Sequence, residues 1–204
     1  MMDNLSQDTK NILGLQLPTD PRWVNLASIS LEDILTDHAY CEQKAANSCI
    51  SLITKYNEKD QLVNELSSIV TEEWGHFRLV LAELRKRNLP FGKQRKDEYV
   101  NKLLEFQKKG GNPEERFLDL LLTMALIEAR SCERFKRLSE GLDDEYMRNF
   151  YRRFMESEAG HYTSFITLAE TYIKKEKVRA RWKEWLSYEA VVIKNLEVRG
   201  DRVH

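Results

Sequence analysis

A pattern of glutamate and histidine three positions apart occurs twice in this chain of 204 residues. The copies run from Glu73 to His76 (EWGH) and from Glu158 to His161 (EAGH). A further glutamate precedes each copy at nearly equal distance, Glu42 by 31 residues and Glu128 by 30 residues. Residues three apart lie on one face of an α-helix, so both members of each pair can bind one metal ion. The repeated spacing therefore constrains how the chain can fold.

The midpoint of each interval falls where the sequence predicts a turn between two helices. Tyr56–Asp60 (YNEKD) lies in the middle of the first interval and Gly141–Asp144 (GLDD) in the middle of the second. Both segments are typical of helix ends and starts. At a rise of about 1.5 Å per residue, about 15 helical residues on each side of a turn return the chain to the same height. Each preceding glutamate is therefore expected to face its Glu-x-x-His pair across an antiparallel hairpin.

Two such hairpins would place four glutamates and two histidines at one level of a four-helix bundle. This is the ligand scheme of ferritin-like di-iron and di-manganese carboxylate proteins. Four ionised carboxylates in an apolar interior would repel one another, and two divalent ions would neutralise them. Oxygen and imidazole donors suit iron or manganese, although they do not separate these metals from zinc. The predicted metal ligands are Glu42, Glu73, His76, Glu128, Glu158 and His161.

Glu72 competes with Glu73 for the role of ligand, because it lies one helical turn from His76. The second copy has Ser157 at the position of Glu72, so Glu73 is preferred. The alternative to a metal centre is a helical bundle in which these residues form buried salt bridges or exposed pairs.

Three residues near the predicted ligands are also informative. His38 lies one turn before Glu42 and either supports that ligand or is an ordinary hydrogen-bonded structural histidine. Gly75 and Gly160 lie inside the ligand pattern. A glycine within a helix costs about 1 kcal/mol relative to alanine, so these two glycines are expected where backbones approach closely.

The composition favours an all-α protein, because the chain has only eight glycines and four prolines. Residues 1–28, which include Pro18 and Pro21, are predicted to form an irregular arm before a helical domain at 29–204. The order hairpin, long connection, hairpin predicts a ferritin-like four-helix bundle with one long crossover and an additional C-terminal helix. Predicted helices cover residues 30–56, 60–88, 96–108, 113–139, 143–177 and 181–197.

No apolar run reaches the 18 or more residues typical of a membrane span. The segment Met1–Asn4 lacks a basic region followed by an apolar one, so a cytoplasmic protein without membrane contact is expected. The three cysteines are an odd number without zinc-site spacing, which favours reduced thiols.

Basic residues gather in two segments although the net charge is only −1. Residues 78–96 hold seven Lys or Arg against one acid, and residues 174–183 hold six against one. Such segments either bind phosphates or are solvated helix ends. Nearby aromatic residues either stack on bases or fill a core, namely Tyr99, Phe106, Trp182 and Trp185.

The segments around the predicted ligands resemble one family, the tRNA 2-methylthio-isopentenyladenosine hydroxylases. The similar segments are Thr36–Ala46, Glu72–Phe77, Ile127–Phe135 and Ser157–Tyr162. The resemblance covers about residues 20–197 and is most specific in Ile127–Phe135. It implies a non-haem di-iron monooxygenase that hydroxylates the isopentenyl group of the modified adenosine beside the anticodon of tRNA.

Carried over by position, the resemblance makes the six predicted residues ligands of two iron ions, with O2 as co-substrate and no further catalytic residue. An unactivated C–H bond requires oxygen activated at reduced iron, so each turnover needs two electrons. The sequence has no Gly-x-Gly-x-x-Gly motif and no cysteine cluster. An external electron donor, a ferredoxin or a reductase, is therefore predicted beside the tRNA substrate.

Two other functions compete with this one. The first is another ferritin-like di-metal activity, such as peroxide reduction, iron storage or manganese catalase activity. The second is a non-enzymatic tRNA-binding helical protein with a structural metal, which the presence of all six ligands disfavours.

Overall fold

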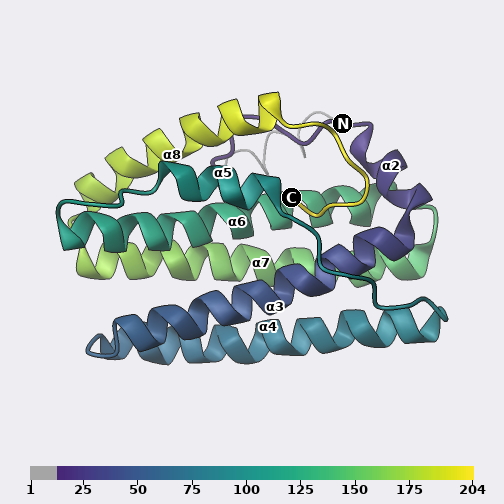
Figure 1. The fold of residues 1–204 in the computed structure, drawn as a ribbon, viewed down its shortest axis with the longest axis horizontal. Helices are drawn as coiled ribbons and strands as arrows, with labels where there is room; N and C mark the ends of the chain where they lie inside the picture. The colour runs from purple at the N-terminus through teal and green to yellow at the C-terminus, as the bar shows by residue number, and fades with distance from the viewer. Residues whose placement is uncertain (1–12) are drawn as a thin grey trace. The chain divides into compact units, whose positions relative to one another are not determined.

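Residues 13–204 are described by the structure, a computed structural model. In this range the chain forms helices α2 to α8 and no strand, which confirms the predicted all-α class. The chain divides into two compact units. We call residues 22–96 and 199–203 the first hairpin unit, and residues 13–21, 97–198 and 204 the second hairpin unit. Each unit contains one pair of long antiparallel helices (Figure 1).

The first hairpin unit consists of α2 (Trp23–Ile29), α3 (Leu31–Lys55) and α4 (Asp60–Lys86). The long helices α3 and α4 pack against each other. Their connection falls at residues 56–59, where the sequence predicts the first turn. Ser30 precedes α3, but its side chain makes no capping hydrogen bond.

The packing of α4 follows one stripe of buried side chains at intervals of three or four residues. A stripe of this period is what an amphipathic helix presents to a neighbour. It is apolar except for Glu73 and Glu83, and its members are Leu62, Leu66, Ile69, Glu73, Phe77, Val80, Glu83 and Leu84. The carboxylate of Glu73 therefore lies on the core-facing side of α4, among apolar side chains.

The second hairpin unit consists of α5 (Glu98–Phe106), α6 (Pro113–Gly141), α7 (Glu145–Tyr172) and α8 (Lys175–Asn195). Asn112 caps α6 by accepting a hydrogen bond from the Glu114 N–H, and Pro113 takes the first helical turn, where its missing N–H costs nothing. Asp144 caps α7. The turn between α6 and α7 therefore lies where the sequence predicts it, and α5 lies within the predicted crossover.

Two predicted boundaries differ from the structure. The predicted irregular arm at 1–28 contains α2, because Trp23 and Ala27, one turn apart, are both fully buried; residues 1–12 of that arm lie outside the described residues. The predicted helix 143–177 ends at Tyr172, because the backbone is extended at Ile173 and Lys174. Ile173 is buried there, so α8 begins six residues earlier than predicted, at Lys175.

The segment after α8 returns to the first hairpin unit. The carboxylate of Asp37 on α3 accepts a hydrogen bond of 2.7 Å from the Val203 N–H, and Trp23 donates one of 3.2 Å to the Arg202 carbonyl. Gly200 passes so close to α2 that a Cβ would clash with the backbone of Leu26. Only glycine fits at that crossing.

A buried ion-pair network joins α6 to α8 in the second hairpin unit. Arg130, which is fully buried, donates to Glu189 at 2.6 and 2.9 Å and to Glu133 at 3.2 Å. Glu133 also accepts hydrogen bonds from Thr19 and from Arg137. Since Arg130 and Glu133 lie in Ile127–Phe135, the segment that most specifically resembles the hydroxylase family, part of that resemblance is structural.

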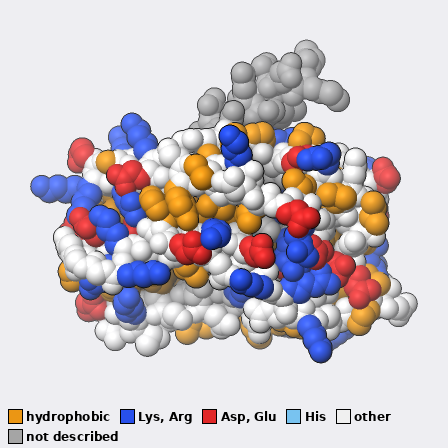
Figure 2. All heavy atoms as spheres, turned by 45° about the horizontal axis from the view of Figure 1, so that its top comes forward, with side chains coloured by type: hydrophobic (Ala, Val, Ile, Leu, Met, Phe, Trp, Pro, Cys, Tyr) orange, Lys and Arg blue, Asp and Glu red, His pale blue; other side chains and the backbone are white. Residues whose placement is uncertain are grey.

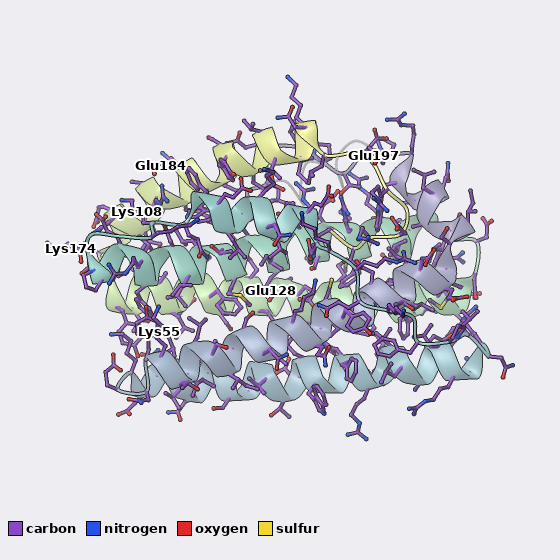
Figure 3. The ribbon with its side chains drawn as sticks, viewed as in Figure 1. Lys55, Lys108, Glu128, Lys174, Glu184 and Glu197 are labelled. Atoms are coloured by element: carbon purple, nitrogen blue, oxygen red, sulfur yellow. The ribbon has the colours of Figure 1, made fainter. Side chains whose placement is uncertain are left out.

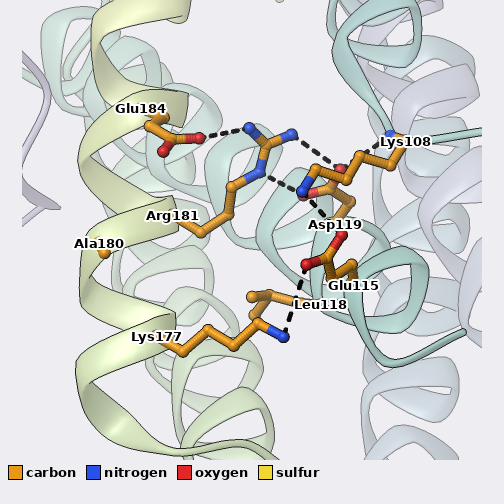
Figure 4. Close-up of a pocket in the computed structure, with 8 residues that line it drawn as sticks. All are labelled: Lys108, Glu115, Leu118, Asp119, Lys177, Ala180, Arg181 and Glu184. Carbon is orange, nitrogen blue, oxygen red and sulfur yellow. Dashed lines mark hydrogen bonds and ion pairs between the residues drawn. The ribbon is translucent and has the colours of Figure 1, made fainter. Parts of the chain in front are cut away.

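A second network holds the start of α8 on α6, beside a surface pocket (Figure 4). Asp119 accepts hydrogen bonds from Arg181 at 2.7 and 2.8 Å, from the Lys108 N–H at 2.8 Å and from Trp185 at 3.1 Å. Burial alone would raise the pKa of Asp119, but these donors outweigh burial and hold the pKa below its ordinary value of 3.8. The ionised carboxylate therefore stabilises the fold.

The substitution Asp119→Asn is expected to lower the free energy of unfolding at pH 7 by about 1–3 kcal/mol, because the donors lose a charged acceptor. A depressed carboxyl pKa contributes stability that is lost as the pH falls through the folded value, here below 3.8. The variant should therefore lose less stability than the wild type between pH 5 and pH 3, as measured by urea unfolding. Glu184→Gln is the control, since this exposed partner of Arg181 should change stability by less than about 1 kcal/mol.

Within residues 13–204, no helix has the length and apolar character that crossing a membrane requires.

Candidate metal centre

The first hairpin unit brings together three of the predicted ligands, which we call the first trio: Glu42, Glu73 and His76. Glu42 lies on α3, and the other two lie on α4. The Nδ1 atom of His76 is 3.3 Å from Oε2 of Glu42 and 3.7 Å from Oε2 of Glu73. Both carboxylates are buried, whereas the His76 side chain is 15% exposed. The predicted meeting across the first hairpin is therefore present in the structure.

The second hairpin unit contains the corresponding second trio: Glu128, Glu158 and His161. Glu128 lies near the middle of α6 (Figure 3), and the other two lie on α7. One potential ligand atom of each residue lies within 4.8 Å of those of the other two. The Nδ1 atom of His161 is 3.6 Å from Oε2 of Glu158, nearly the separation in the first trio. All three residues are buried.

On α7 the two ligands belong to the buried stripe of the helix. Its members are Met147, Tyr151, Phe154, Glu158, His161, Phe165 and Leu168. Two polar groups within an otherwise apolar stripe carry a large desolvation cost unless they have polar or ionic partners. Their position indicates a role other than packing.

His38 supports the first trio from within α3. Its Nε2 atom is 2.6 Å from Oε1 of Glu42, and the imidazole is fully buried. A histidine that holds one oxygen of a carboxylate fixes the rotamer of that side chain and leaves the other oxygen, Oε2, facing His76. Of the two sequence readings, the structure therefore supports the one in which His38 positions Glu42.

The donor set in each trio fits a divalent metal ion. Two buried carboxylates within 4.8 Å of one imidazole form a compact anionic group without a sulfur donor. Two carboxylates at this separation in a dry interior repel each other, and a bound cation would offset that repulsion. Carboxylate and imidazole donors are those of non-haem iron and of manganese.

Cys132 lies one helical turn from Glu128 but is not a good ligand. Burial, together with the charges of Glu158 and Glu133, raises the pKa of its thiol to about 12. Its sulfur donates to the Met155 carbonyl at 3.3 Å. The thiol therefore stays protonated near neutral pH, in agreement with a buried core residue. Cys41, Cys49 and Cys132 form no disulfide with one another.

The explanation of the two glycines by close backbone approach is wrong. A Cβ built on Gly75 or on Gly160 has no described atom within 4 Å outside its own helix backbone. Neither glycine has a positive φ. Packing therefore does not require glycine at either position.

Most cations of the basic segment at 174–183 pair with acids in the second hairpin unit. Glu170 pairs with Lys175 at 3.4 Å and with Arg179 at 3.5 Å. Lys177 pairs with Glu114 at 2.8 Å, and Arg181 pairs with Asp119. Figure 2 shows the same mixture, with Lys and Arg side chains among Asp and Glu side chains on the face in view. The solvated helix end is therefore the better reading of this segment.

The four aromatic residues considered for base stacking serve mainly as core. Tyr99 and Trp185 are buried. Phe106 is half-buried, stacks on Tyr188 and packs edge-on against Trp185. The half-buried Trp182 packs against Tyr162. None of the four is exposed in the way that a stacking platform requires.

Comparison with known proteins gives a consistent family. Residues 6–204 match the family described as tRNA-(MS2IO6A)-hydroxylase (MiaE). A Pseudomonas putida protein named tRNA 2-(methylsulfanyl)-N(6)-isopentenyladenosine(37) hydroxylase is 37% identical over 158 residues, which cover 78% of this chain and 76% of that protein. A Salmonella typhimurium protein of the same name is 28% identical over 228 residues, which cover 88% of this chain and 83% of that protein.

A solved structure supports the fold over nearly the whole chain. It is described as Protein 43 with aldehyde deformylating oxygenase activity from Synechococcus, and it is 32% identical to this chain. The match has a TM-score of 0.87 and covers 93% of this chain and 94% of that one. The neighbour is a ferritin-like helical protein, so the predicted fold class is confirmed. By the family match and the Pseudomonas relative, the chain belongs to the tRNA-(MS2IO6A)-hydroxylase family.

Proposed function

We propose that this protein is a tRNA-modifying monooxygenase that hydroxylates the isopentenyl group of 2-methylthio-isopentenyladenosine beside the anticodon. Family membership supports the substrate, and the two carboxylate–histidine trios support the chemistry. The repeated geometry is the observation that carries the proposal. In both trios, the Nδ1 atom of the histidine lies close to Oε2 of the glutamate three residues earlier on the same helix. The distance is 3.7 Å for His76 and 3.6 Å for His161.

We assign the six residues of the two trios as ligands of a pair of iron ions, with four carboxylates that neutralise four positive charges. When bound, the iron pair would supply the activation of O2 that side-chain acids and bases cannot provide. The chain itself would hold the ligands at fixed rotamers, with His38 orienting Glu42 through the contact of 2.6 Å. The apolar stripes of α4 and α7 that flank Glu73 and Glu158 would keep bulk water from the reacting carbon.

Electrons would come from a separate protein, a ferredoxin or a reductase. The chain has three cysteines, fewer than the four thiolates that usually hold an iron–sulfur cluster. Reconstituted protein given a nicotinamide cofactor alone is expected to make no product, and addition of reduced ferredoxin should restore turnover. Turnover with the nicotinamide cofactor alone would contradict this part of the proposal.

A gain-of-function assay tests the substrate. The chain would be expressed in a bacterial strain that makes 2-methylthio-isopentenyladenosine but cannot hydroxylate it, and tRNA nucleosides would be analysed by mass spectrometry. We expect a nucleoside heavier by one oxygen atom, which is absent from the empty-vector strain. Without that product the proposed substrate is wrong.

The oxygenase activity named for the Synechococcus structure gives a second candidate, an aldehyde substrate. The reconstituted protein should therefore also be offered a long-chain aldehyde with the same electron donor. Conversion of the aldehyde without hydroxylation of tRNA would favour that candidate over ours.

A further inference from the structure

The basic segment at 78–96 differs from the one at 174–183 in how its charges are used. Its only acid, Glu83, is buried and pairs with Arg87 at 2.5 Å and with Lys86 at 3.9 Å. Arg95 pairs with Asp33 and with Asp201. The other four cations form no ion pair within the described part of the chain and are exposed: Arg78, Arg85, Lys93 and Lys96.

Two of these cations share one face of α4 with an exposed tryptophan. Trp74, Arg78 and Arg85 follow at intervals of four and seven residues, which places them in one line along the helix. The line is about 16 Å long at the α-helical rise. The Trp74 side chain is 45% exposed, although large apolar side chains are usually covered. This line lies beside the buried stripe of α4 that carries Glu73 and belongs to the same helix as His76.

The loop after α4 adds a second aromatic side chain and the other two cations. Phe91 is 42% exposed, stacks on Tyr40 of α3 at 4.6 Å and packs edge-on against Phe77 at 6.1 Å. Phe77 in turn contacts Trp74 at 4.9 Å. The loop is fixed at Gly92, whose carbonyl accepts a hydrogen bond of 3.0 Å from Tyr40. Lys93 and Lys96 follow directly in the chain.

We propose that Trp74, Arg78 and Arg85 of α4, with Phe91, Lys93 and Lys96 of the following loop, form the RNA-docking surface. The occupant is the anticodon stem–loop of the tRNA, so this inference rests on the proposed function. Unpaired cations bind phosphates, and exposed aromatic rings stack on unpaired bases, which a loop of RNA offers and a duplex does not. Docking here places the RNA on the helix that supplies Glu73 and His76.

The test compares two pairs of lysines. Lys93→Gln/Lys96→Gln removes two cations from the proposed surface, and Lys174→Gln/Lys183→Gln removes two exposed lysines from the other basic segment, where neither forms an ion pair within residues 13–204. Both double variants have the same net charge. The probe is a fluorescein-labelled anticodon stem–loop RNA that carries 2-methylthio-isopentenyladenosine, and its affinity is measured by anisotropy over a range of salt concentrations.

We expect the Lys93/Lys96 variant to bind this RNA roughly tenfold more weakly, with the slope of log K against log salt reduced by about two, one for each lost phosphate contact. The Lys174/Lys183 variant should stay within about twofold of the wild type. Equal effects of the two double variants, or none, would overturn the proposal. So would unchanged RNA binding combined with slower reduction by ferredoxin, because the surface would then serve the electron donor.

Trp74 offers an independent readout. Trp23 and Trp185 are fully buried and Trp182 is half-buried, so stacking on RNA should quench mainly the fluorescence of Trp74. The substitution Trp74→Leu should abolish the quenching caused by RNA and weaken binding by roughly tenfold. Iron content is measured in parallel, because Trp74 is next to Glu73. If RNA still quenches the tryptophan fluorescence of Trp74→Leu as fully as that of the wild type, Trp74 does not stack on the RNA.

The two proposals can fail separately. If the wild type binds the RNA through Lys93 and Lys96 but yields no hydroxylated nucleoside in the gain-of-function assay, the docking surface stands and the proposed function falls. If hydroxylation occurs while the lysine pairs behave alike, the function stands and the surface is wrong.

Discussion

Replacing Glu73 with glutamine is expected to reduce iron binding below two ions per chain and to lower hydroxylation by more than about 100-fold, because even groups that only support a ligand change affinity or activity by 10–100-fold. The matched control is Glu72→Gln, the adjacent and exposed glutamate. It should leave iron content and activity close to those of the wild type. Iron is measured by atomic absorption after anaerobic ferrous reconstitution, and activity by nucleoside mass analysis.

The same substitution should have the opposite effect on the metal-free protein. Glu73 is 1% exposed, so its ionised form is costly without a bound cation. Glutamine removes that charge, and the free energy of unfolding of the metal-free protein should rise by about 1–2 kcal/mol. The wild type, but not the variant, should gain thermal stability on adding ferrous iron. A variant that is less stable than the wild type without metal would contradict a ligand role and support an internal salt bridge.

Removing Arg130 is expected to give the largest loss of stability. Arg130→Met should lower the free energy of unfolding by about 3–5 kcal/mol, because breaking the buried ion pair with Glu189 leaves uncompensated charge on that carboxylate, whereas Glu133 keeps Arg137. Burial already raises the pKa of Glu189, and Arg130 opposes that rise. Without Arg130 the pKa of Glu189 should rise further, so the variant should be less destabilised at pH 5 than at pH 8. Urea unfolding at both values measures the difference.

Arg179→Met is the control for charge and side-chain size. Arg179 is 70% exposed and pairs with Glu170 at 3.5 Å on the surface of the same hairpin unit. Exposed pairs of this kind contribute about 0–1 kcal/mol. A loss as small in Arg130→Met as in Arg179→Met would show that the network around Arg130 does not hold α8 on α6.

The sequence predicts the long helices and both trios because each depends on local periodicity. The two side chains of a Glu-x-x-His pair meet within one helical turn. Each preceding glutamate reaches its pair because the helices on the two sides of the turn are equally long. The structure accordingly places Glu42 with His76, and Glu128 with Glu158 and His161, within each hairpin. The joining of both trios around one pair of metal ions remains a prediction.

Features that depend on contacts between distant segments are not readable in this way. The segment around Trp23 is helical although two prolines are close by. Its indole ring is buried and donates a hydrogen bond to the carbonyl of Arg202, which is distant in the sequence. The break at Ile173 has no glycine or proline to mark it and depends on burial of that side chain. The two basic segments look alike in sequence. The segment at 174–183 differs because Glu170, Glu114 and Asp119, which lie outside it, form ion pairs with its cations.

Gly75 and Gly160 lie within the two continuous helices that carry the Glu-x-x-His pairs, at positions where no described neighbour requires a small residue. Each weakens its helix by about 1 kcal/mol relative to alanine, so alanine at both positions would be an inexpensive route to a more heat-resistant protein. The added methyl groups would meet no described side chain, so this gain should not disturb the packing around Glu73 or Glu158.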